Sequence, residues 1–166
     1  QDLRAAYDVA RPAPEGRPWV MLCMVSSLDG STVVDNTSRG LSNPTDQALL
    51  LLLRTFADVI LVGAATVREE RYGPPRGERQ RIAVVSRSGD LDYGSRLFTS
   101  GKGVVVLPED APDVPVESIR AGTGQVDLAA ALTQMHDRWG TRVVQAEGGA
   151  TLNGLLTSAD LIDELN

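Results

Sequence analysis

The sequence predicts an α/β fold, and three features support this. Five short, mainly apolar segments are typical of strands buried on both faces of a sheet, namely Trp19–Val25, Val59–Val62, Ile82–Val85, Val104–Leu107 and Arg142–Ala146. Several of them end at glycine, serine or threonine, after which a helical pattern begins. The length of 166 residues suits one domain with a substantial core.

The composition disfavours several classes of protein. A formal net charge of −6 argues against a broad basic surface for nucleic acid. The longest wholly apolar run, Ala48–Leu53, is too short to span a membrane, and no signal peptide is recognisable, so a cytoplasmic protein is expected. Cys23 is the only cysteine and His136 the only histidine. Disulfides, zinc sites of the Cys/His type and a Ser-His-Asp triad are therefore not expected, and no metal is assigned.

The polar, proline-bearing residues 1–18 are expected to form an N-terminal arm, and residues 19–166 the domain itself. The segment Leu155–Asn166 ends where another strand should begin. The domain is therefore expected to be incomplete at its C-terminal end.

Two helices have recognisable starts. Asn43 is a good N-cap, and Pro44 fits the first helical turn. The Ala48–Phe56 stretch that follows is almost wholly apolar, so it should lie in the core or at a subunit contact. Asp127 is expected to cap a second helix, whose Leu128, Leu132, Met135 and Trp139 share one face.

The turn after the last apolar segment suggests an anion site. Glu147 is followed by Gly148, Gly149 and Ala150, which lead into a helical pattern. Such a turn exposes main-chain N–H groups at a helix N-terminus, where a diphosphate is favoured. Glycine is also the ordinary residue of a tight strand-to-helix turn, so both interpretations remain open.

Two further strand ends are also candidate phosphate sites. Gly63, with the small Ala65 and the hydroxyl of Thr66, forms a second glycine-led junction, and Ser86-Arg87-Ser88 suits a phosphate monoester because arginine presents a planar fork of donors. A solvated turn is the simpler interpretation of 86–88 alone. Used together, the three junctions fit two bridging phosphates and a terminal one, as in NADPH. The usual G-x-G-x-x-G fingerprint is absent.

The end of the first strand is a fourth candidate. Ligands in open α/β sheets bind at the carboxyl ends of strands, so Ser26 is placed to meet one. The Asp29-Gly30 pair that follows is also a common turn signal, so Asp29 has a purely structural interpretation as well.

Several motifs occur in an order that resembles a known family. They are Ser27-Leu28-Asp29-Gly30, Leu52-Leu53-Arg54, Ala57–Gly63 with Thr66, Glu147–Leu152 and Asp160–Leu165. This order is similar to the C-terminal reductase domain of the bacterial bifunctional riboflavin-biosynthesis deaminase-reductase, over most of residues 19–166. The resemblance implies a dihydrofolate-reductase-like, three-layer α/β/α fold with a mixed, mostly parallel sheet, and a homodimer. It also implies reduction of 5-amino-6-(5-phosphoribosylamino)uracil by NADPH. The partner deaminase's zinc ligands are absent from this chain.

The resemblance assigns residues to the cofactor and the substrate. Ser38, Arg54 and Glu147 would contact the substrate, with Glu147 also reaching the cofactor, and Ser26 would lie near the nicotinamide. The NADPH site would otherwise comprise Gly63, Ala65, Thr66, Glu70, Ser86, Arg87, Ser88, Gly148, Gly149, Ala150, Thr151 and Leu152. Glu70 stands where the family carries an acidic residue. The segment from Glu69 to Arg76 otherwise departs from the family pattern, so no residue is assigned as the family's substrate-binding arginine.

The expected reaction is hydride transfer to C1′ of the ring-opened ribosylamine, with Asp29, Asp46 or water relaying a proton. Pro44-Thr45-Asp46 also resembles the helix start that carries the pterin-binding acid of dihydrofolate reductases, so Asp46 is a candidate substrate ligand. A pteridine or folate substrate is therefore an alternative. The altered 69–76 segment suggests a second alternative, in which the protein is a regulatory module that binds NADPH without turnover.

Overall fold

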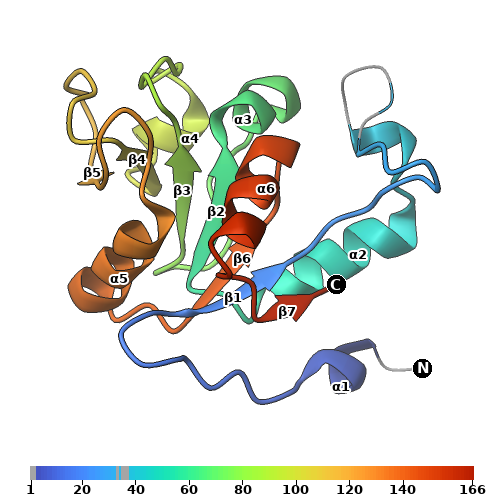
Figure 1. The fold of residues 1–166 in the computed structure, drawn as a ribbon. Coiled ribbons are helices and arrows are strands. Elements are labelled where there is room, and N and C mark those ends of the chain that lie inside the picture. The colour runs from blue at the N-terminus through green and yellow to red at the C-terminus, as the bar shows by residue number, and fades with distance from the viewer. Residues whose placement is uncertain (1–2, 33, 35–37) are drawn as a thin grey trace.

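Seven strands form one sheet in the order β5-β4-β3-β2-β6-β1-β7 in the computed structural model, which describes residues 3–32, 34 and 38–166 (Figure 1). Every strand pairing in this described part is parallel. The strands are β1 (Trp19–Leu22), β2 (Val59–Gly63), β3 (Arg81–Val85), β4 (Gly103–Leu107), β5 (Ser118–Arg120), β6 (Val143–Ala146) and β7 (Glu164–Leu165).

Helices cover both faces of the sheet, giving three layers. They are α1 (Leu3–Tyr7), α2 (Pro44–Arg54), α3 (Ala64–Glu70), α4 (Arg96–Thr99), α5 (Leu128–Trp139) and α6 (Ala150–Ser158), with a 3-10 turn η1 at Ser38–Gly40. In the described part of the chain, no helix has the length and apolar character needed to cross a membrane.

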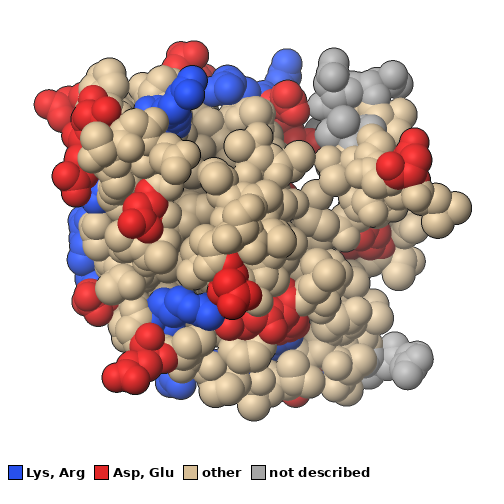
Figure 2. Space-filling view, viewed as in Figure 1, with Lys and Arg blue, Asp and Glu red and all other residues tan. Residues whose placement is uncertain are grey.

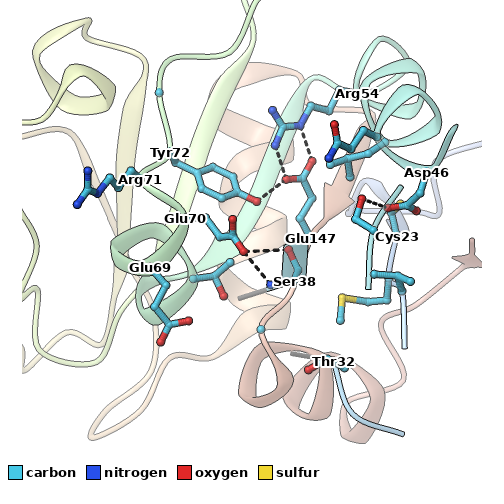
Figure 3. Close-up of a pocket in the computed structure, with 18 of the residues that line it drawn as sticks. Cys23, Thr32, Ser38, Asp46, Arg54, Glu69, Glu70, Arg71, Tyr72 and Glu147 are labelled. Atoms are coloured by element: carbon cyan, nitrogen blue, oxygen red, sulfur yellow. Dashed lines mark hydrogen bonds and ion pairs between the residues drawn. The ribbon is translucent and has the colours of Figure 1, made fainter. Parts of the chain in front are cut away.

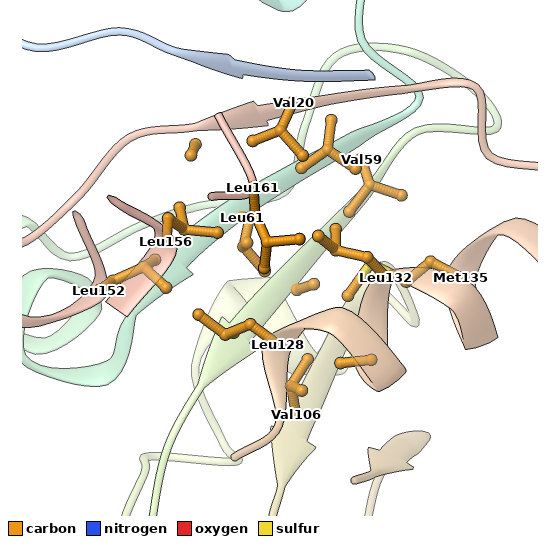
Figure 4. Close-up of a cluster of buried hydrophobic side chains, with 14 of the residues drawn as sticks. Val20, Val59, Leu61, Val106, Leu128, Leu132, Met135, Leu152, Leu156 and Leu161 are labelled. Atoms are coloured by element: carbon orange, nitrogen blue, oxygen red, sulfur yellow. The ribbon is translucent and has the colours of Figure 1, made fainter. Parts of the chain in front are cut away.

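The core divides between the two faces because strand side chains alternate. One face carries Val59, Leu61 and Val144, which pack against Leu132 of α5 and Leu156 of α6 (Figure 4). The opposite face carries a cluster under α3 and α4 and another under α2. This two-sided burial explains why the strands appear in the sequence as continuous apolar runs.

Most predicted elements are confirmed. The strands begin and end within three residues of the predicted limits, and Asn43 and Asp127 cap α2 and α5 by accepting main-chain N–H bonds. The α/β/α layers are also as expected. The sheet, however, is wholly parallel over the described residues rather than mixed, and the sequence analysis missed β5 and α4.

The segment before β1 is held against β7, the last strand, by hydrogen-bonded ion pairs. Arg11 forms two hydrogen bonds with Glu164 at 2.6 and 2.8 Å, and Arg17 does the same with Asp163. The short strand β7 lies parallel to β1 at the edge of the sheet. It lies within the Leu155–Asn166 segment, which the sequence analysis expected to end before a further strand begins. A domain boundary at residue 18 remains a prediction.

Charged side chains are dispersed over the surface that Figure 2 shows. Lys and Arg lie in small separate groups among Asp and Glu, and a wide area without charge covers the middle of this face. This distribution agrees with the net charge of −6, because no broad basic area is present on the face in view.

Candidate active site

A cleft of about 410 Å³ opens at the carboxyl ends of β1 and β6, between α2 and the residues that follow α3 (Figure 3). This volume is in the range of small-molecule sites. Seven residues predicted for substrate or cofactor line it, namely Ser38, Asp46, Arg54, Thr66, Glu70, Glu147 and Gly149. The structure thus brings together residues from three distant parts of the sequence, 38–54, 66–70 and 147–149.

Glu147 is the centre of a hydrogen-bond network in this cleft. Its Oε1 accepts from Arg54 Nε at 2.6 Å and from Gln145 Nε2 at 3.0 Å. Its Oε2 accepts from Arg54 Nη2 at 2.6 Å and from the Tyr72 hydroxyl at 2.8 Å. Each carboxylate oxygen therefore has two donors, and the arginine binds in a bidentate manner, which is the strongest geometry for such a pair.

The network keeps its groups in defined protonation states. Burial opposes the charge of Arg54, but the hydrogen bonds and negative charge of Glu147 outweigh it, so the pKa of Arg54 lies above its ordinary value. Burial, followed by the charge of Glu147, raises the pKa of Tyr72 far above that of a free phenol. At neutral pH Arg54 is therefore charged and Tyr72 is a neutral donor.

Two more carboxylates of the cleft are held by serines. Glu70 accepts from the Ser38 main-chain N–H at 3.0 Å and from its hydroxyl at 2.9 Å. Asp46, in the first turn of α2, accepts from the Ser42 hydroxyl at 2.6 Å. Glu70 and Asp46 thus face the same space as Glu147, from opposite walls (Figure 3).

Cys23 lies at the floor of the cleft beyond the end of β1. Burial, together with the charges of Glu147 and Asp46, raises its pKa to about 11. At neutral pH it is a thiol rather than a thiolate, so it is a poor nucleophile.

The glycine junctions of β2 and β6 meet beside the cleft. The Gly63 N–H donates to the Gly148 carbonyl at 2.7 Å, and a Cβ on Gly63 would lie 3.4 Å from the Gly149 nitrogen. A Cβ on Gly149 would lie 3.0 Å from Thr66 Oγ1, and Gly148 has a φ of +88°. The two main chains therefore approach as only small residues permit, and they form a glycine cradle flanked by the side chains of Thr66 and Met24.

The third junction, residues 86–88, follows β3, which is the neighbour of β2 in the sheet. Gly63 is in register with Val85, so Ser86 starts the turn beside the cradle. Ser86 is buried and its hydroxyl accepts from the Gly89 N–H at 3.0 Å, whereas Arg87 and Ser88 are exposed. Ser86 thus stabilises the turn, and the side chains of Arg87 and Ser88 extend from this turn into solvent.

The other predicted site residues lie outside the cleft lining. Ser26, Asp29, Ala65, Ala150 and Thr151 are exposed. Leu152 is 3% exposed and packs in the core, so it can offer a ligand only its main chain.

Asp29 is poorly suited to be a proton donor in this structure. The Ser27 hydroxyl and the Ser31 N–H donate to its carboxylate, which holds its pKa below the ordinary value. It is therefore ionised at neutral pH and remote from the Glu147 network. Of the two predicted acids, Asp46 is the one that lines the cleft.

Sequence reasoning missed Tyr72, Gln145 and Ser42 as parts of this site. Gln145 carried a signal, because it is a polar residue inside an apolar strand and is fully buried there. Tyr72 gave no sequence signal of a site residue, apart from its place in the segment that departs from the family pattern. Its role depends on Arg71, whose left-handed φ of 53° ends α3 and turns the chain toward the cleft.

A parallel sheet covered on both faces, with a polar cleft at its strand ends, is typical of open α/β folds that bind ligands there. The solved structures that resemble this chain place it in the dihydrofolate-reductase-like class of these folds. Residues 18–166 match the family described as the RibD C-terminal domain, and the chain belongs to that family.

Known relatives agree with this assignment. The chain is 29% identical to the 2,5-diamino-6-ribosylamino-4(3H)-pyrimidinone 5′-phosphate reductase of Methanothermobacter thermautotrophicus, over 90% of this chain and 76% of the relative. It is 31% identical to the riboflavin biosynthesis protein RibD of Chlamydia trachomatis, over 89% of this chain but only 44% of that longer protein.

Solved structures show the same fold. A pyrimidine reductase-like protein from Corynebacterium diphtheriae superposes with a TM-score of 0.77 at 27% identity, covering 89% of this chain and 72% of that one. The riboflavin biosynthesis reductase Rib7 of Saccharomyces cerevisiae gives a TM-score of 0.73 at 23% identity, covering 98% and 75%.

Proposed function

We propose that the protein is an NADPH-dependent reductase of riboflavin biosynthesis that acts on a 6-ribosylaminopyrimidine 5′-phosphate. The observation that carries this proposal is the position of the cleft, which opens directly beside the side-chain-free contact of Gly63 with Gly148 and Gly149. Family membership supports the same reaction class.

The cradle suits the diphosphate of a dinucleotide. Its main-chain groups lie where the neighbouring strands β2 and β6 end, and a Cβ at Gly149 would fill space next to Thr66. Gly63, Thr66 and the first turn of α6 would hold the diphosphate, with Arg87 and Ser88 near a terminal phosphate. When bound, NADPH supplies the hydride.

The residues of the cleft hold the substrate. Glu147 and Arg54 would bind it next to the cofactor, and Ser38 and Asp46 would contact it from two opposite walls of the cleft. Their main task is to bring C1′ of the ring-opened imine within about 3–3.5 Å of the hydride donor and to exclude water. Asp46 is the candidate for proton relay, because it faces the cleft and Asp29 does not.

Two pyrimidines remain candidates for the substrate. The family resemblance implies 5-amino-6-(5-phosphoribosylamino)uracil, whereas the archaeal relative is named for the 2,5-diaminopyrimidinone. A pteridine is a further alternative, favoured by the position of Asp46 in the cleft. A cofactor-binding module without turnover is the alternative outside the enzymes.

Turnover tests this proposal. NADPH oxidation should be observed with one or both aminopyrimidine ribosyl phosphates and should be absent with dihydrofolate. Oxidation with dihydrofolate alone would establish the pteridine alternative. Tight NADPH binding without oxidation of any of these compounds would identify the protein as a binding module.

We also propose that the protein is a homodimer, as the family resemblance implies, and that it is cytoplasmic, as the sequence analysis expects. The α2 helix supports this assembly, because Leu53 is its only buried residue although Ala48–Leu53 is wholly apolar. Leu51 is 38% exposed. An apolar helix face left open in this way is typical of an interface.

Leu51→Asp should therefore convert a dimer into a monomer, because it introduces a charge into the apolar face of α2. Light scattering after size-exclusion chromatography measures this change. Thr55→Asp, at the exposed end of the same helix, is the matched control. A monomeric wild type, or a dimer that persists in Leu51→Asp, would contradict this assembly.

A further inference from the structure

A side-chain amide without hydrogen bonds lies beside the glycine cradle. Asn153 is on α6, one turn beyond Gly149, whose carbonyl accepts the Asn153 main-chain N–H at 3.1 Å. The side-chain Oδ1 of Asn153 is buried and accepts no hydrogen bond from the described residues, and Nδ2 donates none to them. A buried polar atom without a partner costs free energy in a folded protein, so this amide requires an explanation.

The amide lies on the side of the cradle where Met24 packs. A Cβ on Gly148 would be 2.9 Å from Met24 Sδ and 3.5 Å from Asn153 Nδ2, so the two side chains approach the same point. Met24 follows β1 and lines the cleft, as does Gly149. Asn153, which is not itself part of the lining, therefore lies next to Met24 at the boundary between the cradle and the cleft.

This position selects one part of the proposed cofactor. With the diphosphate in the cradle and the substrate in the cleft, the nicotinamide nucleoside must lie between them, because its ring delivers the hydride. The diphosphate has only acceptors, so it cannot satisfy Oδ1 of Asn153. The nicotinamide carboxamide has a carbonyl acceptor and an amino group that donates, which match Nδ2 and Oδ1 respectively.

Met24 is suited to give the carboxamide access to Asn153. Its side chain is half-buried at the edge of the cleft. Methionine is unbranched and has three rotatable side-chain bonds, so it repacks more readily than other apolar residues. A change in the Met24 rotamer would therefore open the Asn153 amide to a ring bound between the cradle and the cleft.

We propose that Asn153 binds the nicotinamide carboxamide and so orients the ring for hydride transfer. This inference rests on the proposed function and deepens it, because it assigns a residue to the reactive end of the cofactor. Asn153 Nδ2 donates to the carboxamide carbonyl, and Oδ1 accepts from the carboxamide amino group. A cofactor analogue without that amino group leaves Oδ1 unsatisfied and is bound more weakly.

Equilibrium binding tests this proposal without requiring turnover. The reduced 3-acetylpyridine analogue of NADPH carries a methyl group in place of the carboxamide amino group. Calorimetry should give a Kd for NADPH about tenfold or more below that for the analogue. Asn153→Leu, which nearly keeps the size of the side chain, should reduce this ratio to about twofold or less.

Two further variants complete the test. Asn153→Ala introduces no added bulk and should give the same ratio as Asn153→Leu, so the result does not depend on the fit of leucine. Thr157→Val is the matched control, because Thr157 is exposed one turn further along α6 and its hydroxyl donates only to the helix main chain. This control should leave the ratio unchanged.

Several outcomes would overturn this proposal. An equal loss for both compounds in the Asn153 variants would show a role in folding or in binding another part of the cofactor. Equal affinities of the wild type for the two compounds, or failure of NADPH to bind, would also overturn it. NADPH oxidation with a ratio independent of Asn153 would overturn this proposal alone. A ratio that depends on Asn153, without oxidation by any candidate substrate, would overturn only the proposed reaction.

Discussion

The Glu147 side chain is 2% exposed, and that of its partner Arg54 is 23% exposed. Transferring such charges out of water is costly, and the cost is offset only when each polar atom has a partner. Arg54, Gln145 and Tyr72 meet this requirement for Glu147. At the scale of single residues, the network is therefore a structural support that also forms part of the cleft wall.

Removal of Arg54 should destabilise the fold strongly, because it leaves a buried carboxylate without its charge partner. Arg54→Leu should lower the free energy of unfolding in urea by about 3–5 kcal/mol. Arg81→Leu, which removes the exposed pair with Glu117, is the matched control and should cost about 1 kcal/mol or less for the ion pair. Equal effects of the two substitutions would show that the Glu147 network does not stabilise the fold.

Individual elements were more predictable than the contacts between them. The N-cap side chains of Asn43 and Asp127 act on neighbouring main-chain atoms, so local sequence was sufficient to locate α2 and α5. The short β5 has only one buried residue, Ile119, and therefore no recognisable apolar run. Tyr72 reaches Glu147 across 75 positions of sequence, a contact that no local pattern specifies.

The attachment of the N-terminal segment to β7 should weaken in acid. Burial alone would raise the pKa values of Asp163 and Glu164, but hydrogen bonds, chiefly from Arg17 and Arg11 respectively, outweigh it and hold both pKa values below their ordinary range. Because these values are lower in the folded state, their contribution is present above the unfolded values of about 4. It is lost as the pH falls through the folded values.

Amide hydrogen exchange of residues 3–18 measures this attachment. Protection should be maintained near neutral pH and should decrease as the pH falls below about 4. At neutral pH, Arg17→Ala should produce the same loss, whereas Arg96→Ala, on α4, should not. Protection that is independent of both pH and Arg17 would contradict a role for these ion pairs.

The whole molecule depends on the strand order. The strands β3, β2 and β6 are neighbours and run parallel, so their carboxyl ends lie side by side. The three predicted phosphate-binding junctions, which follow these strands, therefore lie on the same side of the molecule. The sequence revealed the three junctions and suggested that together they suit NADPH, and the family resemblance implies the same cofactor.

NADPH titration of a matched pair of glycine variants tests the central claim most directly. Gly149→Asp places a side chain against Thr66 and a negative charge in the cradle, whereas Gly154→Asp, on the same helix, has open space around its Cβ. Calorimetry should show tight NADPH binding by the wild type and by Gly154→Asp, and a loss of at least about a hundredfold in Gly149→Asp. A thermal melt of each variant, followed by circular dichroism, separates this loss of binding from a loss of the fold. Equal NADPH affinity in Gly149→Asp and Gly154→Asp would contradict the assignment of this cradle to the cofactor.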